Sequence, residues 1–156
     1  SEKEIKNFYN YDNLPSDMKF RIAEFYSVSN YQMDIYDVMQ VYYKPEDKKF
    51  IIFALNGNLY CTDNSWCNKK YENIIDDLST SFNNSDNAIT DTFKHTDDKS
   101  GKSLVKLWKL ELKNGYIIIR NTNWSDEMKY KDNVSLEIIT YEADKWARNN
   151  YGIGYN

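Results

Sequence analysis

An alternating run of side chains from residue 104 to residue 120 is the feature that most constrains the fold. One face of residues 104–112 carries Leu104, Trp108, Leu110 and Leu112, which alternate with the side chains of the other face, and a second apolar run at residues 116–119 is followed by Arg120. Asn114-Gly115 lies between the two runs, and this pair favours a two-residue hairpin loop because both residues tolerate positive φ. We expect one face to be core and the other to meet solvent or a partner. The expected core pairs are Leu112 with Ile117 and Leu110 with Ile119, and the expected outer pairs are Glu111 with Ile118 and Lys109 with Arg120.

A second strand-forming region spans residues 38–61. It reads as a three-stranded meander with strands at residues 38–43, 50–55 and 58–61. Its turns are expected at residues 44–48 and at Asn56-Gly57. The later hairpin region, residues 104–141, gains a third strand at residues 134–141.

Helices are expected between these two regions and near both ends of the chain. Residues 69–82 form the clearest one, capped by Asn68, because its apolar residues follow helical spacing. Shorter helices are expected at residues 2–11, 16–26, 88–93 and 142–150, the last with Trp146 inward and Gly152 as its stop. The stripe of the central helix is Tyr71, Ile74, Ile75, Leu78 and Phe82.

Strands and helices come in blocks, so the predicted class is α+β with a mainly antiparallel sheet. A chain of 156 residues has the usual size of one domain, and residues 1–156 are taken as a single domain. The two strand regions are expected to join in one sheet with the helices on a single face.

Charge narrows the possible partners. Twenty basic residues against 24 acidic ones give a net charge of −4, without the basic stripe that nucleic-acid binding requires. A protein partner with a basic surface fits better, because opposite charges steer encounter. No run of 18 apolar residues exists, so no membrane span is expected.

Cys61 and Cys67 raise the question of compartment. In an oxidising compartment they could form a disulfide over a short loop, whereas in the cytoplasm they would be two free thiols. The cytoplasm is preferred, and an extracytoplasmic location follows if the two cysteines are bridged. The only histidine, His95, is distant in the sequence, so neither a metal site nor a cofactor is expected.

Catalytic patterns are weak. His95 lies in a polar stretch without a placed partner and reads as an exposed loop histidine. Asp98, Glu111 and Lys113 have the spacing of metal-dependent nucleases, but Glu-x-Lys recurs elsewhere in this chain. We therefore predict a non-enzymatic protein, with a metal-dependent nuclease or hydrolase as an alternative.

The surplus of aromatic residues points to binding. The chain holds 14 Tyr, 7 Phe and 4 Trp, and tyrosine and tryptophan are favoured at protein interfaces. The predicted function is a small acidic inhibitor, such as an immunity or phage anti-defence protein; the alternative is an extracytoplasmic protein or lipoprotein domain. A homodimer is also possible. The predicted partner-binding residues are Tyr116, Arg120, Trp124, Asp126, Glu127 and Tyr130.

Overall fold

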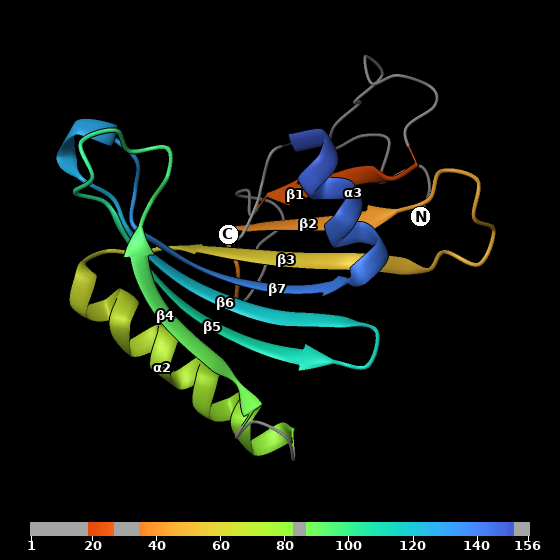
Figure 1. The fold of residues 1–156 in the computed structure, drawn as a ribbon, viewed down its shortest axis with the longest axis horizontal. Coiled ribbons are helices and arrows are strands. Elements are labelled where there is room, and N and C mark those ends of the chain that lie inside the picture. The colour runs from red at the N-terminus through yellow and green to blue at the C-terminus, as the bar shows by residue number, and fades with distance from the viewer. Residues whose placement is uncertain (1–18, 27–34, 83–86, 152–156) are drawn as a thin grey trace.

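The computed structural model describes residues 19–26, 35–82 and 87–151, and it shows an α+β protein built on one seven-stranded antiparallel sheet (Figure 1). The strand order is β1-β2-β3-β7-β6-β5-β4. The strands are β1 (Arg21–Tyr26), β2 (Val38–Tyr43), β3 (Ile52–Tyr60), β4 (Ile89–Lys94), β5 (Leu104–Leu112), β6 (Gly115–Asn123) and β7 (Asn133–Thr140). The helices are α2 (Asn64–Ser81), the short 3₁₀ helix η2 (Asp126–Met128) and α3 (Tyr141–Tyr151).

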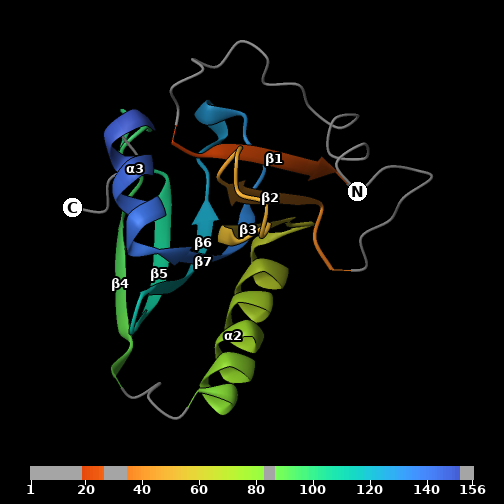
Figure 2. The same ribbon diagram turned by 90° about the vertical axis from the view of Figure 1, so that its right-hand side faces the viewer.

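The two α-helices cover opposite faces of the sheet (Figure 2). Cys67 and Tyr71 of α2 pack with Leu110 and Ile117, whereas Trp146 of α3 belongs to a separate apolar cluster on the other face. The expectation of helices on a single face was therefore wrong. It failed because periodicity shows which side of a helix is apolar, but not which face of the sheet that side will cover.

The central strand β6 is buried on both sides. Ile117, Ile118 and Ile119 have no exposed surface, although they point alternately to the two faces. Ile118 was placed on the face predicted to meet solvent or a partner, and the structure corrects this. A strand covered on both faces reads as a continuous apolar run rather than as an alternating one.

The β5–β6 hairpin has the predicted faces but a register shifted by two residues. Leu112 lies opposite Gly115 and Leu110 opposite Ile117, so the loop consists of Lys113 and Asn114. Gly115 lies within the sheet, where a Cβ atom would overlap the carbonyl oxygen of Ile139. A shift of two preserves the side to which every side chain points.

The N-terminal half departs further from the predicted meander. Residues 21–26 form strand β1 instead of the second half of a helix, and they pair with β2 from Arg21–Tyr43 to Tyr26–Val38. Residues 89–94 likewise form edge strand β4 rather than a short helix. In both segments the hydrogen bonds offered by a neighbouring strand override a weak helical pattern. The predicted helix at residues 2–11, the start of the one at residues 16–26 and Gly152 lie outside the described residues.

Asn56-Gly57 does not form a turn, because β3 runs straight through it. Gly57 pairs with Met39 of β2 and Leu136 of β7. The Tyr36 ring lies against Gly57, and a Cβ atom there would come within 2.7 Å of the ring carbons. Glycine at this position therefore allows a ring to lie directly on the sheet.

The central and C-terminal helices agree better with the predictions. Asp63, not Asn68, caps α2 by accepting a hydrogen bond from the backbone N–H of Trp66, so the helix begins five residues early. Its predicted apolar stripe packs on the sheet. In α3, Trp146 is buried as expected and lies against Phe20 and Tyr42.

The contact between Gly57 and Tyr36 can be tested by substitution. Gly57→Ala should lower the free energy of unfolding by about 1–3 kcal/mol, because the new methyl group displaces the ring. Urea unfolding of this variant, of Tyr36→Ala and of the double variant measures the coupling. The double variant should lose less than the sum of the two single losses, and additive losses would contradict the contact.

Candidate functional site

An aromatic hollow of about 640 Å³ opens where β3 and β6 end and β7 begins. Tyr60 is the last residue of β3, Trp124 follows β6, and Tyr130 lies in the connection to β7. The β4–β5 loop adds His95. The lining residues of this aromatic hollow are Asn58, Tyr60, His95, Asp97, Trp124, Lys129, Tyr130, Lys131 and Asn133.

Carboxylates fix the backbone at Tyr60, which ends β3, and at Trp124, which follows β6. The N–H of Tyr60 donates to Asp37 Oδ2 at 2.7 Å, and the N–H of Trp124 donates to Asp132 Oδ1 at 2.7 Å. The carbonyl oxygen of Asp132 also accepts from the N–H of Cys61 at 2.9 Å. Asp132 therefore holds the ends of β3 and β6 together below the aromatic hollow.

The rings differ in exposure. Trp124 lies between His95, with ring centroids 4.1 Å apart, and Tyr130, whose ring meets it edge-on at 5.0 Å. Tyr60 and Tyr130 are 41% and 61% exposed. Trp124 is thus packed between two rings, and the two tyrosines leave much of their ring surface exposed.

The charge of the aromatic hollow is mixed rather than acidic. Its lining contains Lys129 and Lys131 against Asp97. The ammonium group of Lys131 lies 6.0 Å from the centroid of the Tyr60 ring. The lining thus carries charges of both signs, and the expectation of a partner with a basic surface stays a prediction.

Two further predicted site residues, Asp126 and Glu127, lie on η2 next to the aromatic hollow but do not line it. The Glu127 carboxylate pairs with the Lys102 ammonium group. This contact lowers the pKa of Glu127 and raises the pKa of Lys102. The pair connects η2 to the end of the β4–β5 loop.

Tyr116 and Arg120 lie elsewhere. Lys109 places its ammonium group 3.7 Å from the centroid of the Tyr116 ring, and the Tyr141 ring meets Tyr116 edge-on. Arg120 pairs with Glu137 at 3.0 Å, and its side chain is only 16% exposed. Burial lowers the pKa of Arg120. Arg120, which was predicted to bind a partner, is therefore largely buried and links β6 to Glu137 of β7.

Asp98 organises the loops that support the aromatic hollow. Its buried carboxylate accepts hydrogen bonds from the N–H groups of Ser100 and Ser103, both at 2.8 Å, and from the hydroxyls of Ser103 at 2.6 Å and Ser125 at 2.9 Å. The hydrogen bonds from Ser103, above all from its hydroxyl, and from Ser100 hold the pKa of Asp98 well below its usual range. All four bonds fix the position of the carboxylate. They join the β4–β5 loop to the residue that follows Trp124.

The residues of the nuclease alternative do not converge. Asp98 precedes the start of β5, whereas Glu111 lies near the end of that strand. The rise from the first residue of β5 to Glu111 is roughly 23 Å. Glu111 accepts a hydrogen bond from the Tyr141 hydroxyl at 2.7 Å, which raises the pKa of Tyr141 to about 12. Lys113 belongs to the hairpin loop at that same far end. A single metal ion cannot bind Asp98 and Glu111 in this fold.

Metal-ligating side chains are dispersed in the part of the chain that the structure describes. No three His, Cys, Asp or Glu side chains gather there as a possible ion site. Within the same residues, neither helix has the length and hydropathy needed to cross a bilayer.

Cys61 and Cys67 form a disulfide, with Cα atoms 5.4 Å apart. Cys61 directly follows Tyr60, and Cys67 is fully buried in the first turns of α2. The bridge thus fastens the end of β3, next to Tyr60, to helix α2.

Comparison with known proteins gives no relative: no family matches the chain, and no curated protein or solved structure is significantly similar to it. The geometry alone therefore carries the functional argument.

Sequence reasoning placed Trp124 and Tyr130 at a partner surface but did not include Tyr60 and His95. Tyr60 was read only as part of a strand, and His95 as an exposed loop residue. Their meeting with Trp124 depends on β3 pairing with β7 and on the fold of the β4–β5 loop. The adjacent Cys61 was the one local sign that the end of β3 is fastened.

The role of Asp98 predicts a pH-dependent loss of stability. Its pKa is lowered in the folded state, so its contribution is present above the unfolded pKa of about 3.9 and fades as the pH falls below that value. Asp98→Asn should unfold at lower temperature than the wild type at pH 7. The difference should shrink in thermal melts recorded at successively lower pH below 4. A difference that stays constant through this range would exclude the ionised carboxylate as the hub.

Proposed function

We propose that this protein is a non-enzymatic binding module that holds a protein partner against the aromatic hollow, in the manner of a small acidic inhibitor such as an immunity or anti-defence protein. One observation carries the proposal: three large rings from separate segments meet around one opening, and two of them remain substantially exposed.

The arrangement fits a binding role because the rings are held in place before a partner arrives. Tyrosine and tryptophan supply large contact areas with few rotatable bonds, and they dominate the binding energy of many interfaces. Here the backbone of Tyr60 and Trp124 is fixed by carboxylates, and the Cys61–Cys67 bridge fixes the adjacent chain. Binding therefore costs little further conformational entropy of the chain at these residues.

The chemistry of the lining suggests what the partner presents. Asn58, Asn133 and His95 can exchange hydrogen bonds with a peptide backbone, and Lys129 and Asp97 can pair with charges of either sign. The net charge of −4 acts at longer range and favours approach of a basic protein. Long-range steering therefore favours a partner of basic overall charge, whereas local contact favours a partner that presents hydrogen-bonding groups and charges of both signs.

The test compares four immobilised forms of the protein in capture from cells of its source organism. Tyr60→Ser and Tyr130→Ser remove exposed rings from the aromatic hollow, and each should weaken binding of the captured partner about 30-fold or more. Ile89→Ser is the matched control, because it removes an exposed apolar side chain from edge strand β4. Titration calorimetry with the purified partner measures the three affinities against the wild type. Equal affinity for all four proteins would refute the aromatic hollow as the docking site.

The disulfide favours the second candidate, an extracytoplasmic domain. Disulfides persist in oxidising compartments and are rare in the cytoplasm. The Cys61–Cys67 bridge closes a loop of only a few residues, so its entropic contribution is modest, about 2 kcal/mol. Its position beside Tyr60 is compatible with the binding role, and an exported binding module would satisfy both observations.

The compartment can be tested with protein purified from its natural source. We expect no free thiol when that protein is denatured without a reductant and treated with a thiol reagent. Two thiols should appear after reduction, which is the internal control. Two free thiols before reduction would place the chain in a reducing compartment.

A further inference from the structure

A strained and exposed phenylalanine marks the end of the sheet opposite the aromatic hollow. Phe50 has φ 53°, in the left-handed region that a bulky residue rarely adopts, and its side chain is 73% exposed. The β2–β3 loop that carries it projects beyond the sheet (Figure 1). Glycine would relieve the strain and serine or asparagine would remove the exposed ring, so phenylalanine at this position costs an isolated monomer both backbone strain and an apolar ring in water.

The loop is built to hold Phe50 in this conformation. Both carboxylate oxygens of Asp47 accept backbone hydrogen bonds, from Lys49 at 2.9 Å and from Ile51 at 3.0 Å. The N–H of Phe50 donates to the carbonyl oxygen of Asp47 at 3.2 Å. The backbone on each side of Phe50 is thus tied to one aspartate, and the ring is presented on a fixed turn.

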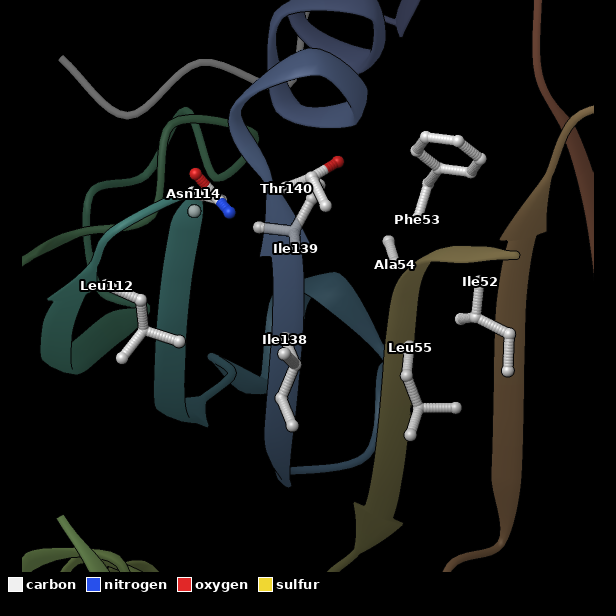
Figure 3. A pocket seen from close by; sticks show the side chains of 10 residues that line it. Ile52, Phe53, Ala54, Leu55, Leu112, Asn114, Ile138, Ile139 and Thr140 are labelled. Atoms are coloured by element: carbon white, nitrogen blue, oxygen red, sulfur yellow. The ribbon is translucent and has the colours of Figure 1, made fainter.

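An apolar hole of about 340 Å³ begins two residues after the exposed Phe50 ring, which we call the knob, because Ile52 is one of its lining residues. Figure 3 shows the side chains that line this hole. Side chains from three strands surround it, and Gly115, opposite Leu112, contributes none. Figure 3 shows four of these side chains on one side of the sheet, while Phe53 and Thr140 point to the side of α3. The four are Ile52, Leu55, Leu112 and Ile138.

A β-bulge produces this arrangement. Tyr42 pairs with Ala54, but Tyr43 pairs with Ile52, so Phe53 is the extra residue. Phe53 turns toward Phe20 beneath α3, with ring centroids 5.1 Å apart, and Ile52 is left at the hole, 56% exposed. Ile138, also at the hole, is 42% exposed.

We propose that Phe50 of one molecule inserts into the hole of a second copy of this chain, and that the reciprocal contact forms a twofold-symmetric homodimer. The knob and the hole belong to one surface patch, which is the requirement for an isologous interface. The space is sufficient, since a dry apolar cavity of roughly 150 Å³ already binds benzene. Glu46, Lys48 and Lys49 give the loop charges of both signs, so two loops can meet without uniform repulsion.

The dimer goes beyond the proposed function and does not depend on it. Strand β3 begins at the hole with Ile52 and ends at the aromatic hollow with Tyr60. The interface therefore leaves both aromatic hollows open at the distal ends of the assembly. Two linked hollows would increase the apparent affinity for a partner that carries repeated binding segments.

Sedimentation velocity over a concentration series from low to high micromolar tests the dimer. The wild type should sediment as a monomer–dimer equilibrium. Phe50→Gly removes the knob and Ile138→Lys obstructs the hole, and each should raise the dissociation constant of the dimer tenfold or more. Tyr130→Ser, at the aromatic hollow, is the control and should dimerise like the wild type.

Mixing the two interface variants makes the test specific. Phe50→Gly keeps a hole and Ile138→Lys keeps a knob, so the mixture can form one of the two contacts while neither variant alone can form any. We expect heterodimers in the mixture at concentrations where each variant alone is monomeric. Phe50→Gly should also melt at or above the wild-type temperature, because glycine accepts positive φ.

Three results would overturn the proposal: a wild type that is monomeric throughout the series, a dimer that persists in Phe50→Gly, or a mixture in which no heterodimer forms. Loss of partner capture in Tyr130→Ser with an intact dimer would concern the aromatic hollow alone. The two proposals can therefore fail independently.

Discussion

Packing from both sides of the sheet is the constraint on which the rest of this structure depends. Strand β6 has neighbours on both edges and a helix over each face, and Ile117, Ile118 and Ile119 are fully buried as a result. Each helix covers only part of its face: α2 lies over β6 and β7 and packs on Leu110 of β5, and α3 lies over β3, β6 and β7 and reaches Tyr42 of β2. The surfaces available for binding are therefore at the ends of the strands, outside the cover of the helices.

The aromatic hollow and the apolar hole are both products of these uncovered ends, but they are built differently. The hollow is held by polar hydrogen bonds, with Asp98 and Asp132 joining loops that carry rings. The hole forms where side chains are missing. Gly115 has no side chain, and the bulge turns the Phe53 ring to the opposite face of the sheet. Polar networks fix one geometry closely, whereas an apolar hole requires only that its occupant be apolar and of a fitting shape.

The local sequence pattern was sufficient to predict the structure where an element depends mainly on residues close to it in the sequence. The faces of the β5–β6 hairpin, the strand at β2, the apolar stripe of α2 and the inward position of Trp146 follow from periodicity and were predicted. The pattern failed where a distant neighbour decides. Residues 21–26 and 89–94 are strands because an adjacent strand offers hydrogen bonds, and Asn56-Gly57 stays extended because β3 is paired on both edges. Of the candidate site, Trp124 and Tyr130 were both named as partner-binding residues, but their ring contact and the ion pair of Arg120 with Glu137 came only from the structure.

The sequence by itself determined the α+β class, the alternation that sorts side chains between two faces, and the surplus of aromatic rings. It did so because these properties depend on spacing along the chain. Only the tertiary structure decided which face each helix covers, which rings meet and which charges are buried. Tyr60, His95 and Trp124 come from three separate strand ends, and the distance between such ends is set by strand order and register rather than by any neighbour in the sequence.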